Sequence, residues 1–224
     1  MSKAFPVLKF KTSRRQVPPT TKKWLVEKTA YLEGVWQEKG PKIMRGIEKQ
    51  CGFGFPAKTI SRGIVVHVHK RGKDENPGDM EETKPFQFNL YVTKSETWRD
   101  VKGVMVHELL HCLMWQKFYF DYRVGKPTFF ADIFADELVT SVVECMVLGR
   151  KPGKQTCGKA VDYALEEAIE RLSRTGRREK LVKALVEFFA EYPVRIRRKG
   201  SNVLKEREKV MNCLPSLLPE SIDG

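Results

Sequence analysis

Residues 104–114, VMVHELLHCLM, place three polar side chains inside an otherwise apolar run. The chain of 224 residues contains only four histidines, and two of them, His107 and His111, stand four residues apart with Glu108 directly after the first. The run contains no proline and no other charged residue, which predicts a buried helix. Three polar side chains are expensive to bury in such a helix unless they bind something.

The spacing of these three residues predicts a metal site. Residues four apart lie on the same face of a helix with Cβ atoms about 5–6 Å apart, so His107 and His111 can hold one zinc ion between them. Glu108 can accept a proton from a water that the metal activates, and this is the H-E-x-x-H arrangement of zinc metallopeptidases. In a chain of this composition, chance gives the pattern roughly 0.006 times. We therefore expect zinc as the cofactor, the two histidines as metal ligands and Glu108 as the catalytic residue.

Composition limits the class of protein. Hydrophobic residues make up 41% of the chain and charged residues 31%, which is ordinary for a soluble globular protein. No stretch reaches the roughly 20 apolar residues of a membrane span, and the basic start of the chain lacks the apolar core of a secretory signal. Five scattered cysteines without a C-x-x-C pair argue against a disulfide framework and against a cysteine-based zinc site. We therefore expect a cytoplasmic protein with no membrane partner.

The net charge of +13 is unevenly distributed along the chain. Residues 1–23 carry seven basic and no acidic side chains, and residues 150–224 carry 17 basic and 11 acidic ones. Residues 101–149 have the opposite balance, with four basic and six acidic side chains. The basic termini suit a polyanion such as nucleic acid, and the acidic centre suits a cation. The alternative explanation of the basic termini is a surface that serves solubility alone.

The pattern of apolar residues predicts an α+β fold that is predominantly helical with a small antiparallel sheet. Strands are expected at residues 64–70 and 86–92, joined by a polar 15-residue connection that is long enough to be functional. Ser95 or Thr97 is expected to cap the helix that contains the motif, and Thr97 with Asp100 forms a capping-box pattern. The helices are expected at residues 20–40, 41–50, 97–117, 129–148, 159–173 and 177–192.

Residues 104–114 closely resemble the active-site helix of the zincin metallopeptidases. The similarity extends more loosely to the strand–loop–strand before this helix and to the helix after it. The resemblance implies a small sheet whose edge strand aligns a peptide substrate above the metal, and residues 86–92 are the candidate for that strand. It also implies a zincin-like metallopeptidase domain at residues 20–193, which leaves a basic N-terminal segment at 1–19 and a basic C-terminal segment at 194–224.

The third metal ligand decides which branch of the zincins this chain resembles. The metzincin pattern needs a histidine at position 117, where this chain has Lys117, and no histidine follows His111. The resemblance is therefore to the gluzincin branch, in which the third ligand is a carboxylate. The acidic residues of the following helix are the candidates, namely Asp132, Asp136, Glu137 and Glu144.

Glu137 is the favoured third ligand. A glutamate reaches farther than an aspartate, and the sequence DELVT is similar to the glutamate-bearing helix of small gluzincin-like proteins. Asp132, Asp136 and Glu144 remain alternatives, and acids that do not bind the metal can orient the ligand histidines. Residues 131–138, ADIFADEL, give a looser similarity to the ImmA/IrrE-type metallopeptidases of bacteria and mobile elements.

The expected function is zinc-dependent hydrolysis of peptide bonds in a protein or peptide substrate, in particular by an endopeptidase. Glu108 takes the proton of the attacking water and passes it to the leaving amine. Three residues are candidates for stabilising the oxyanion, namely Tyr122, Arg123 and His67. His67 and His69 share one strand face, where binding a metal or stabilising an oxyanion is possible and a surface or core role is favoured over both. The rival function is a nucleic-acid-associated protein with a structural or degenerate zinc site, which has no use for Glu108.

Overall fold

The computed structural model describes residues 4–13, 17–73, 75–80, 84, 86–118 and 129–151, with the side chains of residues 115, 117–118 and 129–136 left out of the description. The chain divides into two compact units. One unit comprises residues 1–49 and 53–119, and the other comprises residues 50–52 and 120–224. Among the described elements, α4 (Phe129–Val147) belongs to the second unit, and the others belong to the first apart from the last two residues of the helix Pro19–Cys51.

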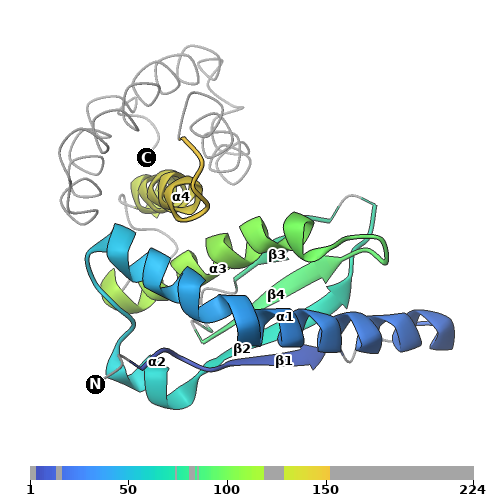
Figure 1. Cartoon of the computed structure of the whole chain (residues 1–224). Coiled ribbons are helices and arrows are strands. Elements are labelled where there is room, and N and C mark those ends of the chain that lie inside the picture. The colour runs from blue at the N-terminus through green and yellow to red at the C-terminus, as the bar shows by residue number, and fades with distance from the viewer. Residues whose placement is uncertain are drawn as a thin grey trace, which may run out of the picture. The chain divides into compact units, whose positions relative to one another are not determined.

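A four-stranded mixed sheet forms the centre of the first unit (Figure 1). Its strands are β1 (Leu8–Thr12), β2 (Ile64–Lys70), β3 (Gly78–Asp79) and β4 (Gln87–Val92), in the spatial order β1-β2-β4-β3. The pairs β1–β2 and β2–β4 are parallel, and only the two-residue β3 pairs antiparallel with β4.

The combination of helices with a small sheet agrees with the predicted α+β class, but the predicted antiparallel sheet is wrong. The two predicted strands are present as β2 and β4, and they run parallel. The polar connection between them returns the chain to the starting end of the sheet and contributes β3 on the way. The prediction also omits β1, whose Leu8 and Phe10 alternate with exposed lysines, because basic residues dominate that segment.

Residues 86–92 were the candidate for the edge strand, and this expectation is also wrong. The strand β4 lies between β2 and β3, so its hydrogen-bonding edges are both used. The edge position belongs to β3, which is too short to show an alternating pattern in the sequence. A Gly-Asp pair inside a polar stretch is typical of a turn. Gly78 and Asp79 form a strand here because their backbones pair with β4.

One face of the sheet carries the core of the first unit. Helix α1 (Pro19–Cys51) lies over this face, since Thr29 receives a hydrogen bond from Thr12 of β1 at 3.1 Å between the two hydroxyl oxygens. Helix α3 (Trp98–Phe118) lies over the same face, where Val104 approaches Gly78 of β3. The buried strand residues on this face are Leu8, Phe10, Ile64, Val66, Val68, Phe88, Leu90 and Val92.

Helix α1 is continuous over 33 residues, whereas two helices separated at residue 40 were predicted. Pro41 lies inside it without ending it. Trp36, Met44 and Ile47 are buried on both sides of the proline, so burial on one face maintains the helix through this point. The ring of Trp36 lies directly over Gly40, where a Cβ atom would come within 2.4 Å of the indole. Trp36 also meets Trp98 of α3 edge to face, with ring centroids 6.3 Å apart.

The predicted boundaries of α3 and α4 are correct to within one residue. The backbone N–H and the hydroxyl of Thr97 both donate to the carboxylate of Asp100 at 2.8 Å, and these bonds lower the pKa of Asp100. A short helix, α2 (Ala57–Arg62), precedes β2 and was not predicted. The helices expected at residues 159–173 and 177–192 and the segment 194–224 lie outside the described residues. Among the helices that are described, none has the length and apolar character needed to cross a membrane.

Two glycines of α1 provide a matched test of this packing. Nothing lies within 4 Å of a Cβ atom placed at Gly34, so Gly34→Ala should raise the free energy of unfolding by about 0.5–1 kcal/mol through helix propensity alone. Gly40→Ala gains the same propensity but drives a methyl group into the Trp36 ring, and overpacking of this kind costs about 1–3 kcal/mol. Denaturant midpoints of the two variants should therefore shift in opposite directions. An increase in both midpoints would contradict the close packing of Trp36 on Gly40.

Candidate metal centre

Helix α3 is buried around most of its circumference. Met105, Leu109 and Cys112 have no exposed surface, and the other apolar positions between Val106 and Met114 are buried as well. Glu108, which is 5% exposed, and His111, which is 9% exposed, therefore lie in the interior, and His107 is half-buried. Burial of a carboxylate and an imidazole on such a helix requires compensating interactions.

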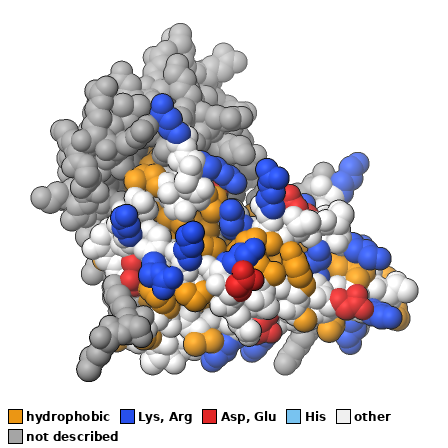
Figure 2. Space-filling model, viewed as in Figure 1, with side chains coloured by type: hydrophobic (Ala, Val, Ile, Leu, Met, Phe, Trp, Pro, Cys, Tyr) orange, Lys and Arg blue, Asp and Glu red, His pale blue; other side chains and the backbone are white. Residues whose placement is uncertain are grey.

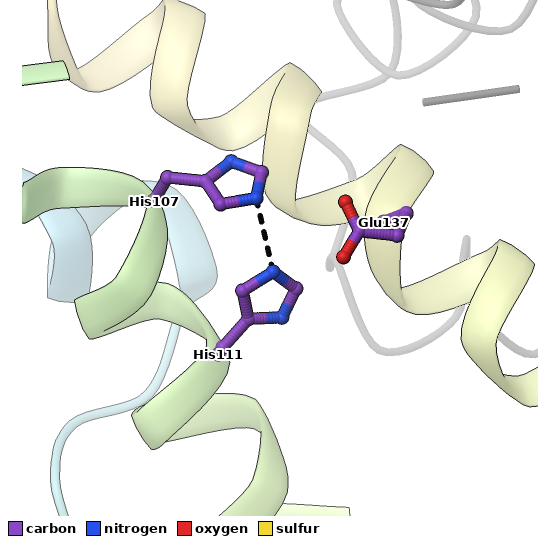
Figure 3. Close-up of side chains that lie close together, drawn as sticks. All are labelled: His107, His111 and Glu137. Carbon is purple, nitrogen blue, oxygen red and sulfur yellow. Dashed lines mark hydrogen bonds between the residues drawn. The ribbon is translucent and has the colours of Figure 1, made fainter. Parts of the chain in front are cut away.

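The two histidines of the motif converge on one point. Their Nε2 atoms are 3.0 Å apart, and the ring planes are inclined at 76° with centroids 4.6 Å apart (Figure 3). Two nitrogens bound to one tetrahedral zinc at about 2.0–2.1 Å lie roughly 3.3 Å from each other. The His107–His111 pair therefore has nearly the spacing that a shared metal ion requires, and only a small separation of the rings would admit one.

Glu137, on α4, completes a group that could hold a metal ion. One ligand atom each from His107, His111 and Glu137 lies within 4.8 Å of the other two (Figure 3). Glu137 is 7% exposed, so its carboxylate is withdrawn from bulk water. Two imidazole nitrogens and one carboxylate oxygen form a ligand set that divalent transition metals accept.

Glu108 lies beside the edge strand of the sheet. A Cβ atom at Gly78 of β3 would come within 2.8 Å of Glu108 Oε1 and within 2.6 Å of the Val104 side chain. The backbone of β3 thus passes directly over this carboxylate, and only a glycine allows so close an approach. This contact was not predicted, although the Pro-Gly pair at 77–78 in a long polar connection was a signal that could have drawn attention to it.

Cys112 is the one thiol next to the motif. It is fully buried, and burial together with the charge of Glu108 raises its pKa well above the usual range of a cysteine. A thiol that resists deprotonation is a poor metal ligand, because the thiolate is the form that binds. Cys112 is therefore held as a neutral thiol in the interior of the first unit.

The remaining candidates for the third ligand differ in how far the structure describes them. The side chains of Asp132 and Asp136 lie outside the described residues. Glu144 is half-buried two helical turns after Glu137 and lies 3.9 Å from Arg150, and it does not belong to the group that could hold a metal.

The candidates for stabilising an oxyanion are not brought to the motif by any described contact. Tyr122 and Arg123 lie outside the described residues. His67 is opposite Asn89 in the strand register and shares a face with His69, which is the sheet face turned away from α3. There His69 bonds to the Asn89 side chain at 3.0 Å and stacks on Tyr91, so a structural role accounts for it.

Comparison with known proteins identifies no relative of this chain. No protein-family model matches it, no curated protein matches it, and no solved structure matches it.

Measurements of zinc affinity in four variants distinguish the proposed ligands from a neighbouring acid. His107→Ala and His111→Ala should abolish the stoichiometric binding of zinc, since each removes one of two converging nitrogens. Glu137→Ala should weaken zinc binding by more than about 100-fold, whereas Glu144→Ala, a matched change on the same helix, should stay within the roughly 10-fold lower end of indirect effects. Competition with a chromophoric chelator measures all four. Tight binding by Glu137→Ala together with loss in Glu144→Ala would refute the ligand assignment.

Proposed function

We propose that this protein is a zinc-dependent metallopeptidase of the zincin type, with His107, His111 and Glu137 as metal ligands and Glu108 as general base. The observation that carries the proposal is the pair of converging imidazoles, with Nε2 atoms 3.0 Å apart, next to a buried carboxylate on the same helix. A purely structural metal site needs ligands but has no use for an additional buried acid beside the first ligand. A hydrolytic site needs that acid to move a proton.

Each residue has a distinct task in the proposed reaction. Bound zinc supplies Lewis acidity, which makes a water more acidic and polarises the carbonyl group of the scissile peptide. Glu108 accepts the proton of the attacking water on a carboxylate oxygen and delivers it to the leaving amine. The buried setting of Glu108 excludes bulk water, so the proton remains within the site between the two steps.

The edge strand offers a way to hold an extended substrate. Among the described strands β3 has a neighbour on one side only, so its outer edge can pair with a peptide backbone. Gly78 lies in contact range of Glu108, so a peptide paired with β3 would lie next to the proposed general base. This arrangement is the reason for proposing a peptide, and not a small acyl compound, as the substrate.

An association with nucleic acid remains the alternative function. Lys39, Lys42, Arg45 and Lys49 are all exposed on the second half of α1. Figure 2 shows Lys and Arg side chains spread over the viewed face of the molecule, with fewer acidic ones between them. Of the two basic terminal segments, the C-terminal one lies outside the described residues, whereas residues 4–13 and 17–23 of the N-terminal one are described and contribute β1. A cytoplasmic location likewise remains a prediction from the sequence.

Substitution of the general base tests the hydrolytic proposal. Glu108→Gln keeps the shape of the side chain and removes its ability to take a proton, so peptide hydrolysis should fall by about 10²–10⁴-fold while zinc remains bound. Asp100→Asn is a matched acid-to-amide change on the same helix, at an exposed position, and should leave the hydrolytic rate unchanged. The assay measures hydrolysis of an unstructured protein such as casein by the zinc-loaded enzyme. Undiminished hydrolysis by Glu108→Gln would refute the role given to this residue.

Salt dependence tests the nucleic-acid alternative. If the basic surface contacts phosphates, the logarithm of the binding constant should fall with the logarithm of salt concentration by about 0.7–0.9 per phosphate neutralised. Titrations of labelled single-stranded and double-stranded DNA at two salt concentrations measure this slope. Glu108→Gln should bind as the wild type does, because the general base lies in the interior. Absence of binding at low salt would eliminate the alternative.

A further inference from the structure

The edge strand β3 is unusually small for the position it holds. It consists of Gly78 and Asp79 alone, which pair with Leu90 and Asn89 of β4. One further backbone bond supports it, from the N–H of Tyr91 to the carbonyl of Pro77 at 2.9 Å. So short a strand at the edge of a sheet is expected to fray unless side chains fix it.

The two residues of β3 face opposite sides of the sheet, because neighbouring residues in a strand alternate. Gly78 faces α3, where it lies against Glu108 and Val104. Asp79 faces the other side, where its carboxylate accepts a hydrogen bond from the Asn89 amide nitrogen at 2.6 Å. The dipeptide Gly78–Asp79 therefore contacts the proposed general base on one face of the sheet and Asn89 on the other.

On that opposite face the contact continues as a row across three strands. An ionised carboxylate only accepts hydrogen bonds, so the Asn89 amide donates to Asp79 and turns its oxygen towards His69. That oxygen lies 3.0 Å from His69 Nε2, which is then the donor. The His69 ring stacks on Tyr91 with centroids 4.9 Å apart and an angle of 29° between the planes. The row thus consists of Asp79, Asn89 and His69, and each of these side chains makes a hydrogen bond to its neighbour in the row.

We propose that the Asp79–Asn89–His69 row is a positioning device that fixes β3 against Glu108. The inference rests on the proposed function, and it assigns to Asp79 and Asn89 a role that acts through Gly78 on the general base. Because Gly78 has no side chain, the position of the β3 backbone directly sets the space available to the Glu108 carboxylate. A shift of β3 by a fraction of an ångström changes that space, and misplacement by about 1 Å can cost 100-fold in rate.

The row could instead serve only the stability of the sheet, and the two roles predict different results. A purely stabilising row would lower the unfolding free energy when broken and leave the turnover number of the folded, zinc-loaded protein intact. A positioning row lowers the turnover number while the protein stays folded and keeps its metal. The separation of kcat from KM and from zinc content therefore distinguishes the two roles.

The test compares Asp79→Ala with Asp79→Asn in the full-length, zinc-loaded protein. Asp79→Ala removes the acceptor for Asn89, and we expect kcat on casein to fall by about 10- to 100-fold with zinc content unchanged. Exchange of the Tyr91 amide hydrogen should accelerate at the same time, because that hydrogen is donated to Pro77 next to β3. Asp79→Asn keeps a carbonyl oxygen that can accept the same bond and should restore both values to near wild type.

Two further variants serve as a negative and a positive control for this comparison. Gln87→Ala alters the same face of β4 two residues before Asn89, outside the row, and should change neither kcat nor Tyr91 exchange. Gly78→Ala leaves the row intact and introduces a methyl group against Glu108, so kcat should fall about as far as in Asp79→Ala while the Asp79–Asn89 bond persists. The carboxyl ¹³C chemical shift of Glu108 should move in Gly78→Ala and Asp79→Ala and should stay constant in Gln87→Ala.

Wild-type kcat or wild-type Tyr91 exchange in Asp79→Ala would overturn the positioning role, as would a failure of Asp79→Asn to restore them. Hydrolysis by the wild type is a separate observation. If the wild type hydrolyses nothing, the proposed function fails, and the row is then judged by amide exchange and by the Glu108 carboxyl shift, neither of which depends on catalysis. An unmoved Glu108 shift in Asp79→Ala would overturn the inference in that case as well.

Discussion

Burial of Glu108 and His111 on one apolar helix, with His107 half-buried between the same turns, is the constraint on which the rest of this structure depends. A helix with leucine, valine and methionine on nearly all sides loses stability for each unsatisfied polar side chain that it buries. In α3 the two imidazoles satisfy each other at 3.0 Å. The carboxylate of Glu108 lies against the backbone of Gly78 in β3. The space between them is too small for a side chain at position 78. The position of β3 therefore depends on the position of α3, and a shift of one element requires a shift of the other.

The parts of this arrangement that a sequence can reveal are those set by spacing along one helix. The shared helix face of His107 and His111 follows from the 3.6-residue repeat, and the start of α3 follows from the Thr97–Asp100 pattern, so both were predictable. The strands β2 and β4 are likewise visible, because each has four or more alternating or β-branched residues. These features are local, and local periodicity determines them.

The parts that could not be predicted depend on pairing between distant segments. Nothing within residues 64–70 or 86–92 distinguishes a parallel from an antiparallel neighbour, and the parallel arrangement follows from β1 and from the path of the connection between β2 and β4. The two residues of β3 show no strand pattern in the sequence, and only their pairing with β4 identifies them as a strand. Glu137 was favoured among the four acids by the reach of a glutamate and by the DELVT resemblance together, and helical periodicity does not show that its carboxylate lies close to the histidines.

The contact between Trp36 and Trp98 has a practical consequence for optical measurements. All four tryptophans of the chain, at positions 24, 36, 98 and 115, belong to the compact unit of residues 1–49 and 53–119, and the other unit has none. Two of them are buried and meet edge to face in the middle of α1 and at the start of α3. Intrinsic tryptophan fluorescence therefore observes only the unit that carries the H-E-x-x-H helix. A comparison of fluorescence with far-ultraviolet circular dichroism, which averages over the whole chain, can show whether the two units unfold together or in succession.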